Sequence, residues 1–375
     1  MSIDQVRQNI FFISARIKYE NLGDLLINRI LVEKLRDFGQ IISDDRGVPD
    51  SVYNLLGLKD SERLSSFSNS FVASMMSYKF KLNKDHNSGV FWIKTPGGYH
   101  GSINNFLSTT KSIAIHILLK VFNIHICTFG ISVGPYSKSR QIFEKWKANC
   151  TYFYAVRDSI SQDYAKSIGI DKVLRFPDLA LMSECKLDLS IDKSDEYIIF
   201  SFRESTNDLD NSIDYQERLF TYLSKIVELV SVTWGKRIFV CYQVASDYEF
   251  CSKIYQKYRD RHNIILVEEQ LTINSICDIY SKATYTFSNR LHVLLFSGIF
   301  GSIPVAVIDA EKHRKINGIY KDMDMSDLII DISNQESNIS ETSLIDLSYK
   351  YPEKFFSKKQ EIKKTGETIL NSLFN

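Results

Sequence analysis

The sequence has few of the residues that mark several protein classes. It contains only 6 prolines and 6 cysteines in 375 residues, and no two cysteines form a CxxC pair. The 7 histidines include no HExxH or similar ligand spacing, so neither a disulfide framework nor a zinc site is indicated. A formal net charge of +1 lacks the basic excess with which nucleic-acid-binding proteins neutralise phosphates. We therefore expect no nucleic-acid partner.

Long apolar runs and a secretory leader are missing as well. The most apolar window, residues 112–134, is interrupted by Lys120, Asn123 and two histidines, and we interpret it as a buried helix followed by a buried strand. The amino terminus, "MSIDQVRQNIFFISARI", has no charged start, long apolar run or small-residue cleavage site of a signal peptide. The sequence therefore favours a protein of the reducing cytoplasm.

The sequence also lacks the common nucleotide-binding loops. The chain contains neither GxGxxG nor GxxxxGK[ST], which disfavours a dinucleotide-dependent or P-loop enzyme.

What is present is a regular alternation of apolar strand-like runs with segments of helical period, the pattern of βαβ units and a parallel sheet. Helices are expected at 24–39, 214–232 and 272–282, among others. Strands are predicted at residues 9–14, 89–98, 125–135, 151–158, 172–178, 197–203, 237–243, 263–269, 283–289 and 304–309.

The length of 375 residues favours two domains, and the polar stretch 183–196 is the best linker candidate. We predict an α/β fold with two Rossmann-like domains, residues 1–187 and 196–340, facing each other across a cleft. A helical tail at 341–375 includes the lysine-rich "EKFFSKKQEIKK" and should pack back on the amino-terminal domain. A contact of this tail with an anionic membrane surface is the alternative.

Ligands of open parallel sheets bind beyond the carboxyl ends of the strands. Three of the 6 prolines lie in the segments found there, which indicates fixed turn geometry at one edge. These segments are "NLGD" (21–24), "PGGYHG" (96–101), "GISVGP" (130–135), "VRD" (156–158), "FPDLA" (176–180), "SFRE" (201–204) and "NRLH" (289–292).

The amino-terminal strand ends offer both structural and functional interpretations. Asp24 either caps the helix that follows or presents a carboxylate to the cleft as a base. Gly97 and Gly98 either let backbone amides approach a ligand or form a plain tight turn. His100 lies on a loop rather than an apolar face, which favours a role in a site.

Arg157, Arg203 and Arg290 each lie at or just past a strand end. One such arginine would form an internal salt bridge, for instance with the acidic residue next to it, but three indicate an anionic ligand. Asn289 or Ser288 is a plausible N-cap, which places Arg290 and His292 at a helix amino terminus that attracts anions. A core histidine satisfied by a carbonyl group is the alternative for His292.

Taken in order, these stretches resemble the polysaccharide pyruvyl transferase family, from about residue 10 to about residue 320. The matching features are the strand followed by "NLGD" and a helix, the "GG" loop, "FGISVGP", "VRDSISQDYAKSIGI", "FPDLAL", "SFRE", the long block "LTINSICDIYSKATYTFSNRLHVLLFSGIFGSIPVAVID" and "KINGIY". The sequence departs from the family at Tyr99, where a third glycine is common.

The resemblance implies a GT-B-like fold and the transfer of pyruvate from phosphoenolpyruvate to a sugar as a ketal, with release of phosphate. The family's "RLH", implicated in donor binding and catalysis, falls on Arg290, Leu291 and His292. Arg203 and Lys315 match family cations that could meet donor charge. With Arg157 they form the expected donor set.

For the catalytic groups, we expect His292 to act as acid or base and Asp24 as the base for the acceptor hydroxyl. The cleft on the acceptor side should be lined by Asn21, Gly97, Gly98, His100 and Asp178. Phosphoenolpyruvate is then a co-substrate, and no metal or other cofactor is expected.

The resemblance also implies a role in the assembly of a capsule, an exopolysaccharide or the cell wall. The acceptor would be a sugar of a bacterial polysaccharide or of its lipid-linked precursor, and the inner membrane face is an alternative place of work to the open cytoplasm. Two rival functions remain, a GT-B-like glycosyltransferase that uses a nucleotide sugar and a non-enzymatic carbohydrate-binding protein. The sequence does not fix the acceptor hydroxyls, the ketal stereochemistry or the oligomeric state.

Overall fold

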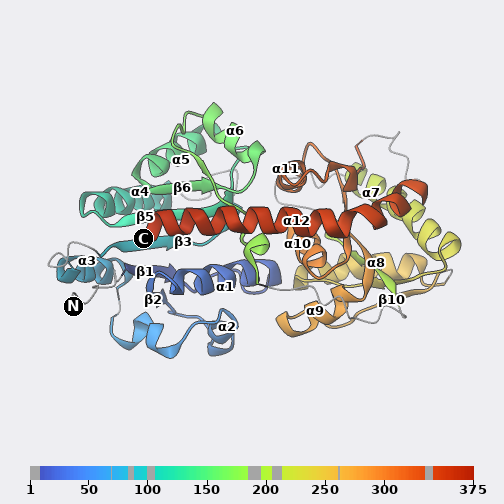
Figure 1. Ribbon diagram of the computed structural model, residues 1–375, viewed down its shortest axis with the longest axis horizontal. Coiled ribbons are helices and arrows are strands. Elements are labelled where there is room, and N and C mark those ends of the chain that lie inside the picture. The colour runs from blue at the N-terminus through green and yellow to red at the C-terminus, as the bar shows by residue number, and fades with distance from the viewer. Residues whose placement is uncertain are drawn as a thin grey trace. The chain divides into compact units, whose positions relative to one another are not determined.

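The computed structural model describes residues 9–68, 70–82, 88–98, 106–184, 196–204, 213–260, 262–333 and 341–375. The chain divides into two compact units (Figure 1). The first unit contains residues 1–19, 24–182 and 363–375, and the second contains residues 20–23 and 183–362. The division therefore gives the short segment 20–23 to the second unit and splits the carboxyl-terminal tail between the two.

The first unit is built on a parallel sheet in the order β2-β1-β3-β5-β6-β7, with the short β4 paired to β5. Because strand order reverses between β1 and β3, the carboxyl ends of these two strands form a topological switch point, where such sheets bind ligands. The strands are β1 (Asn9–Ser14), β2 (Gly39–Asp44), β3 (Val90–Lys94), β4 (Gly97–Gly98), β5 (His125–Ser132), β6 (Phe153–Val156) and β7 (Leu174–Arg175).

Helices cover this sheet and bury apolar clusters against it. One cluster gathers Phe12, Ile42 and Ile126 with residues of α3, and another gathers Ile131, Tyr154 and Ala165. The helices are α1 (Leu22–Arg36), α2 (Asp50–Leu55), α3 (Phe71–Leu82), α4 (Phe106–Val121), α5 (Lys138–Cys150) and α6 (Ser159–Ser167).

The expectation of a buried helix within residues 112–134 is wrong for α4. Ile117, Leu118 and Val121 are 42%, 40% and 75% exposed, whereas His116 and Leu119 are buried. A helix on the outside of a sheet buries only one stripe of its surface, however apolar the other side chains are.

The second unit is also built on a parallel sheet, in the order β10-β9-β8-β11-β12-β13. This is the Rossmann order, and its switch point lies between β8 and β11. Its strands are β8 (Tyr197–Ser201), β9 (Arg237–Val240), β10 (Ile264–Leu266), β11 (Ala283–Ser288), β12 (Ile303–Ile308) and β13 (Ile329–Asp331).

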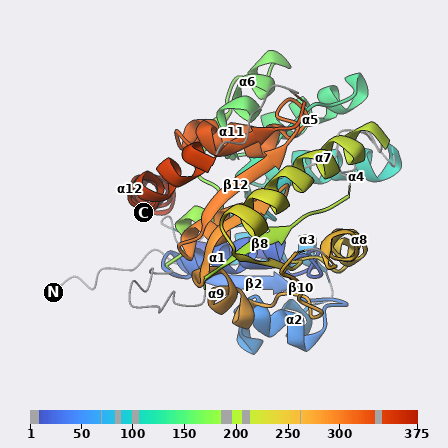
Figure 2. The same ribbon diagram turned by 90° about the vertical axis from the view of Figure 1, so that its right-hand side faces the viewer.

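Figure 2 faces this unit and shows α7, α8 and α9 around β8 and β12. The helices are α7 (Ile213–Glu228), α8 (Tyr248–Tyr258), α9 (Ile273–Ser281), α10 (Leu291–Ile299) and α11 (Arg314–Asp322). The prediction of two Rossmann-like α/β sheets is therefore confirmed.

The tail is one long helix, α12 (Glu341–Phe374), shown in red in Figure 1. Its first part belongs to the second unit, where the Lys359 ammonium donates to the carbonyl of Ser183 at 3.0 Å. Its end belongs to the first unit, where the Phe374 ring lies 4.8 Å from Phe11 and 5.1 Å from Phe91. The Asn9 side chain donates to the carbonyl of Phe374 at 2.9 Å, so the last turn is held by both apolar and polar contacts.

Two strands, β2 and β13, were not expected, and the first helix ends at Arg36 rather than at Gly39. Gly39 instead begins β2, where a side chain would collide with the carbonyl oxygen of Asn9 on the neighbouring strand. Among the described residues, no helix is both long and apolar enough to span a bilayer.

Replacement of Phe374 by alanine tests the anchoring of α12. Phe374 is 3% exposed and contacts aromatic rings of β1, β3 and β5. We expect F374A to lower the free energy of unfolding by about 3–5 kcal/mol, measured by urea denaturation. The control is I142A on α5, where the side chain is 61% exposed and the loss should stay below about 0.5 kcal/mol. Equal losses would contradict this packing.

Candidate functional site

The switch point of the second unit brings together Arg203, which follows β8, and Arg290, which follows β11. The buried side chain of Asn289 ties the two segments together. Its Oδ1 accepts a hydrogen bond from the backbone N–H of Arg203, and its Nδ2 donates to the Arg203 carbonyl, both at 2.9 Å. The backbone that carries one arginine is therefore fixed by the residue that precedes the other.

Arg290 forms an ion pair with Asp247, a buried residue of the turn after β9. Burial raises the pKa of Asp247, and the charges of Arg290 and Arg203 oppose that rise. The guanidinium of Arg290 keeps further donors, because its Nε is buried and bonds to no side chain or backbone group in the described part of the chain. Asp247 thus orients Arg290 without using all of its donors.

Helix α10 begins directly after Arg290, its N-cap residue, whose side chain forms no capping hydrogen bond. The expected cap, Asn289, is occupied by Arg203, and the Ser288 hydroxyl accepts from the backbone of Arg290 at 2.9 Å. Neither of the two expected caps therefore caps α10, and the amino terminus of a helix favours an anion.

His292 lies in the first turn of α10 and packs against the backbone of Gly23. A methyl group on Gly23 would overlap the Cβ atom and ring of His292. This contact exists because residues 20–23 join the second unit: Asn21 pairs with Val244, and the N–H of Leu22 donates to the carbonyl of Gln243 at 3.3 Å. The "NLGD" and "RLH" motifs thus meet at Gly23 and His292.

The residues of "NLGD" divide between the units. The Asn21 side chain accepts a hydrogen bond from the N–H of Gly23 at 3.0 Å at the start of α1. Asp24 lies in the first turn of the same helix and belongs to the first unit. The side chain that caps the start of α1 is therefore that of Asn21, whereas Asp24 was the residue expected to cap this helix.

Behind the arginines lies a buried polar group that includes Tyr215 and His313. The Asn289 amide donates to the Tyr215 hydroxyl at 3.1 Å, and that hydroxyl lies 3.5 Å from Nε2 of His313. Burial, together with the charge of Arg203, lowers the pKa of His313 to about 3, so its ring is neutral at pH 7. Lys315 lies nearby in sequence, in the first turn of α11, and is half-buried.

In the first unit, Arg157 and Asp178 bind each other. The Arg157 guanidinium donates to Asp178 at 2.6 Å and to the Ser132 hydroxyl at 2.7 Å, and the two charged side chains are 3% and 1% exposed. Asp158, the expected neighbour, caps α6 instead by accepting from the N–H of Ser161. The pair Arg157–Asp178 thus joins strand ends inside the first unit.

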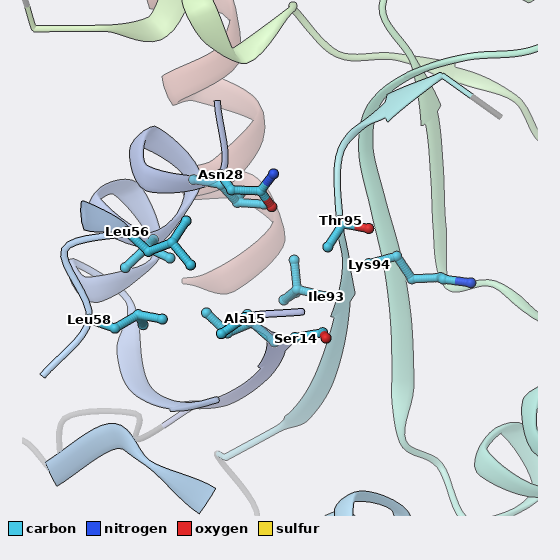
Figure 3. A pocket seen from close by; sticks show the side chains of 11 residues that line it. Ser14, Ala15, Asn28, Leu56, Leu58, Ile93, Lys94 and Thr95 are labelled. Atoms are coloured by element: carbon cyan, nitrogen blue, oxygen red, sulfur yellow. The ribbon is translucent and has the colours of Figure 1, made fainter. Parts of the chain in front are cut away.

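The first unit has a small pocket at its switch point (Figure 3). Ser14 and Ala15 line it from the end of β1, Thr95 from the end of β3 and Asn28 from α1. The remaining wall is mostly apolar and comprises Ile13, Leu31, Val32, Leu56, Leu58 and Ile93, with the backbone of Lys94. Its volume of about 10 Å³ admits roughly one water molecule, so a sugar would require it to open.

The glycine pair forms β4, in which Gly97 and Gly98 lie opposite Ile131 and Ser132. Gly97 has φ +124°, a conformation that residues with side chains rarely adopt, so the turn requires glycine there. His100 lies outside the described residues. Within the part of the chain that the structure describes, no group of three or more His, Cys, Asp or Glu side chains is arranged to hold a metal ion.

Three comparisons relate the chain to known proteins. The model of the family polysaccharide pyruvyl transferase matches residues 21–312. The structure is similar to the UDP-GlcNAc 2-epimerase of Methanocaldococcus jannaschii, with 12% identity, TM-score 0.54 and coverage of 98% of this chain and 99% of that one. It is also similar to the UDP-GlcNAc 2-epimerase of Neisseria meningitidis bound to UDP-GlcNAc, with 14% identity, TM-score 0.50 and the same coverage. These similarities confirm the GT-B-like fold, and no curated protein matches the sequence significantly.

Sequence reasoning missed Asp247, Tyr215 and His313. Asp247 and His313 also follow strands, β9 and β12, but at a greater distance along the chain than Arg203 and Arg290 follow theirs. Tyr215 gives no such signal, because it lies inside α7 and its role arises only from the tertiary contact with Asn289.

The contact between Gly23 and His292 predicts a steric cost for G23A. The added methyl would overlap the histidine ring, so we expect a loss of about 1–3 kcal/mol in unfolding free energy, although alanine favours a helix over glycine. In an H292A background the ring is gone and only the Cβ atom remains, so the cost of G23A should fall in part. An equal cost in both backgrounds would contradict the contact.

A double-mutant cycle tests the pair Arg290–Asp247. Because the carboxylate is buried and the guanidinium is only 17% exposed, R290Q and D247N should be coupled by about 1–3 kcal/mol in unfolding free energy. The matched control is the exposed pair Lys253–Glu204, for which coupling should stay below about 1 kcal/mol. A coupling near zero for Arg290 and Asp247 would show that Asp247 does not hold the guanidinium.

Proposed function

The chain belongs to the polysaccharide pyruvyl transferase family and is therefore a transferase of polysaccharide biosynthesis, and we propose that its donor is phosphoenolpyruvate and its product a pyruvate ketal. The observation that supports this proposal is the second switch point, where Arg203 and Arg290 flank the start of α10. This arrangement suits a small, strongly anionic donor.

The charge of phosphoenolpyruvate fits these groups. Its carboxylate and phosphate carry nearly three negative charges at neutral pH, and guanidinium groups pair with both kinds of oxygen. We assign Arg290 and Arg203 to the donor, with Leu291 in the same turn and Lys315 as a third cation. The dipole of α10 would add about half a positive charge at the start of the helix.

In the proposed reaction, His292 delivers a proton to the methylene carbon of phosphoenolpyruvate, which becomes the methyl group. The C2 atom is then electrophilic, a sugar hydroxyl adds to it, and the C–O bond to phosphate breaks. A second hydroxyl of the same sugar closes the ketal. The two hydroxyl protons restore His292 and leave with phosphate, so one phosphate is released for each ketal. His313, with its pKa lowered to about 3, is neutral and a poor proton donor at pH 7.

The family implies a polysaccharide acceptor, and we propose that the first unit binds it. Asp24 would accept the proton of the attacking hydroxyl, with Asn21 holding the turn before it. Gly97, Gly98 and His100 remain assigned to the acceptor side. We also propose that the acceptor is a lipid-linked precursor and that the protein acts in the cytoplasm, at the inner membrane face.

Arg157 and Asp178 have no role as ligands in this proposal. Each neutralises the other in a buried pair, and breaking it to bind a substrate would leave an uncompensated charge. Replacing either residue would affect activity only by changing the structure of the first unit.

Binding of phosphoenolpyruvate tests the proposal before any acceptor is known. Isothermal titration should show binding to the unmodified protein, and R290Q should weaken it at least about tenfold because a charge-assisted pair is lost. The rival glycosyltransferase predicts binding of UDP- or GDP-sugars instead. Phosphoenolpyruvate that fails to bind, while a nucleotide sugar binds, would overturn the proposal.

Turnover tests the role of His292. With a panel of sugar acceptors, phosphate release from phosphoenolpyruvate should fall about 10² to 10⁴-fold in H292N, since positioned proton transfer is lost. The control H262N replaces a histidine of the same unit that lies after α8, outside the site. A carbohydrate-binding protein without enzymatic activity predicts no phosphate release and a sugar affinity that H292N leaves unchanged.

A further inference from the structure

A cluster of charged side chains in the first unit takes no part in the donor site proposed above. Lys94 ends β3, and Arg140, Glu144 and Lys147 follow one another on one face of α5 at spacings of four and three residues. Glu144 is buried; it pairs with Arg140 at 3.2 Å and accepts a hydrogen bond from the Tyr154 hydroxyl at 3.1 Å.

Two rings border the cluster. The Lys94 ammonium lies 5.1 Å above the ring of Trp92, and that ring lies 5.3 Å from the buried ring of His116 on α4. Burial, together with the charge of Lys94, lowers the pKa of His116 to about 4. The imidazole is therefore neutral at pH 7 and adds no charge to the cluster.

The charges of the cluster do not balance. Lys94, Arg140 and Lys147 are cations. Within the described residues, Glu144 is the one carboxylate whose charge affects the pKa of Lys94 or Lys147, and no carboxylate affects that of His116. The excess is two positive charges in a half-buried place. Burial, followed by the charge of Lys147, lowers the pKa of Lys94 to about 8, so the cations disfavour one another.

The cations also have unused donors. In the described part of the chain, neither lysine ammonium forms a hydrogen bond or an ion pair, and the buried Nε of Arg140 has no hydrogen-bond partner. Lys94 and Lys147 are half-buried cations without an ion-pair partner in the described part of the chain, and an anion bound beside them would offset the cost of their burial.

The cluster adjoins the switch point of the first unit. Figure 3 shows the Lys94 side chain pointing away from the pocket at the carboxyl ends of β1 and β3, whereas its neighbour Thr95 lines that pocket. The charged cluster and the pocket thus lie on opposite faces of β3, one residue apart along the strand.

We propose that Lys94, Arg140 and Lys147 form a binding site for a phosphate or diphosphate group of the sugar acceptor. A phosphate group carries up to two negative charges, which matches the excess of the cluster, whereas a carboxylate carries one. The acceptor is then a phosphate-bearing sugar rather than a neutral glycan. This assignment rests on the proposed function only in placing the acceptor on the first unit.

The probe is inorganic pyrophosphate, titrated calorimetrically at low ionic strength. Because the donor site also suits a small anion, the comparison is made in R290Q, which should bind pyrophosphate, whereas K94Q/K147Q in the same R290Q background should bind it at least about tenfold more weakly. The matched control is K145Q, which removes an exposed lysine of the same helix and should leave binding unchanged. R290Q should also retain this binding, because its charge belongs to the donor site.

Each other outcome overturns the assignment. Pyrophosphate could fail to bind, or its binding could be lost in R290Q and kept in K94Q/K147Q. Loss of phosphoenolpyruvate binding in K94Q/K147Q would make the cluster a donor site. This titration needs no turnover and uses a different probe. Its result is therefore independent of the test for phosphoenolpyruvate as donor.

Stability separates a binding site from a structural one. Removing a half-buried cation that has no ion-pair partner should not lower the urea midpoint, so K94Q should unfold at the same or a higher urea concentration. A clear decrease in K94Q, with pyrophosphate binding intact, would assign the cluster to folding instead.

Discussion

The double hydrogen bond between the Asn289 side chain and the backbone of Arg203 is the contact on which the site of the second unit depends. It joins the ends of β8 and β11, the two strands between which the order of the sheet reverses. Parallel strands deliver their carboxyl ends to one edge, and a switch point leaves a crevice there. Asn289 holds the backbone of Arg203 beside that of Arg290, and Asp247 pairs with the Arg290 guanidinium.

The two units use the same physical rule for different chemistry. In the second, the strand ends present guanidinium groups and a helix start, which suits a small anion. In the first, they present a small, mostly apolar pocket on one face of β3 and a cationic cluster on the other. The buried pair Arg157–Asp178 braces the scaffold of the first unit.

Much of the fold was predictable because parallel strands are apolar throughout and stand out against amphipathic helices. β2 and β13 were not predicted. The segment "GQIISD" follows a helix without a break, and "IID" is too short to show the alternation of side chains along a strand. The exposed side of α4 was not predicted because Ile117, Leu118 and Val121 lie on it while His116 is buried, so that polarity did not mark the buried stripe.

The positions of Arg203 and Arg290 just past two strands, and of His292 at a helix start, were predictable because apolar strands show where each segment ends. The partners of these residues were not, because Arg157 meets Asp178 rather than the adjacent Asp158, and Asn289 meets Arg203 across 86 residues rather than capping its own helix. Gly23 beside His292 depends on residues 20–23 joining the second unit, which no local pattern reveals.

A crystal structure of the protein soaked with phosphoenolpyruvate tests the central claim most directly. The account predicts the phosphate and carboxylate of the donor at Arg290 and Arg203, beside the first turn of α10, with His292 facing the methylene carbon. Donor density at Lys94 and Arg140 of the first unit, with the two second-unit arginines unoccupied, would contradict it.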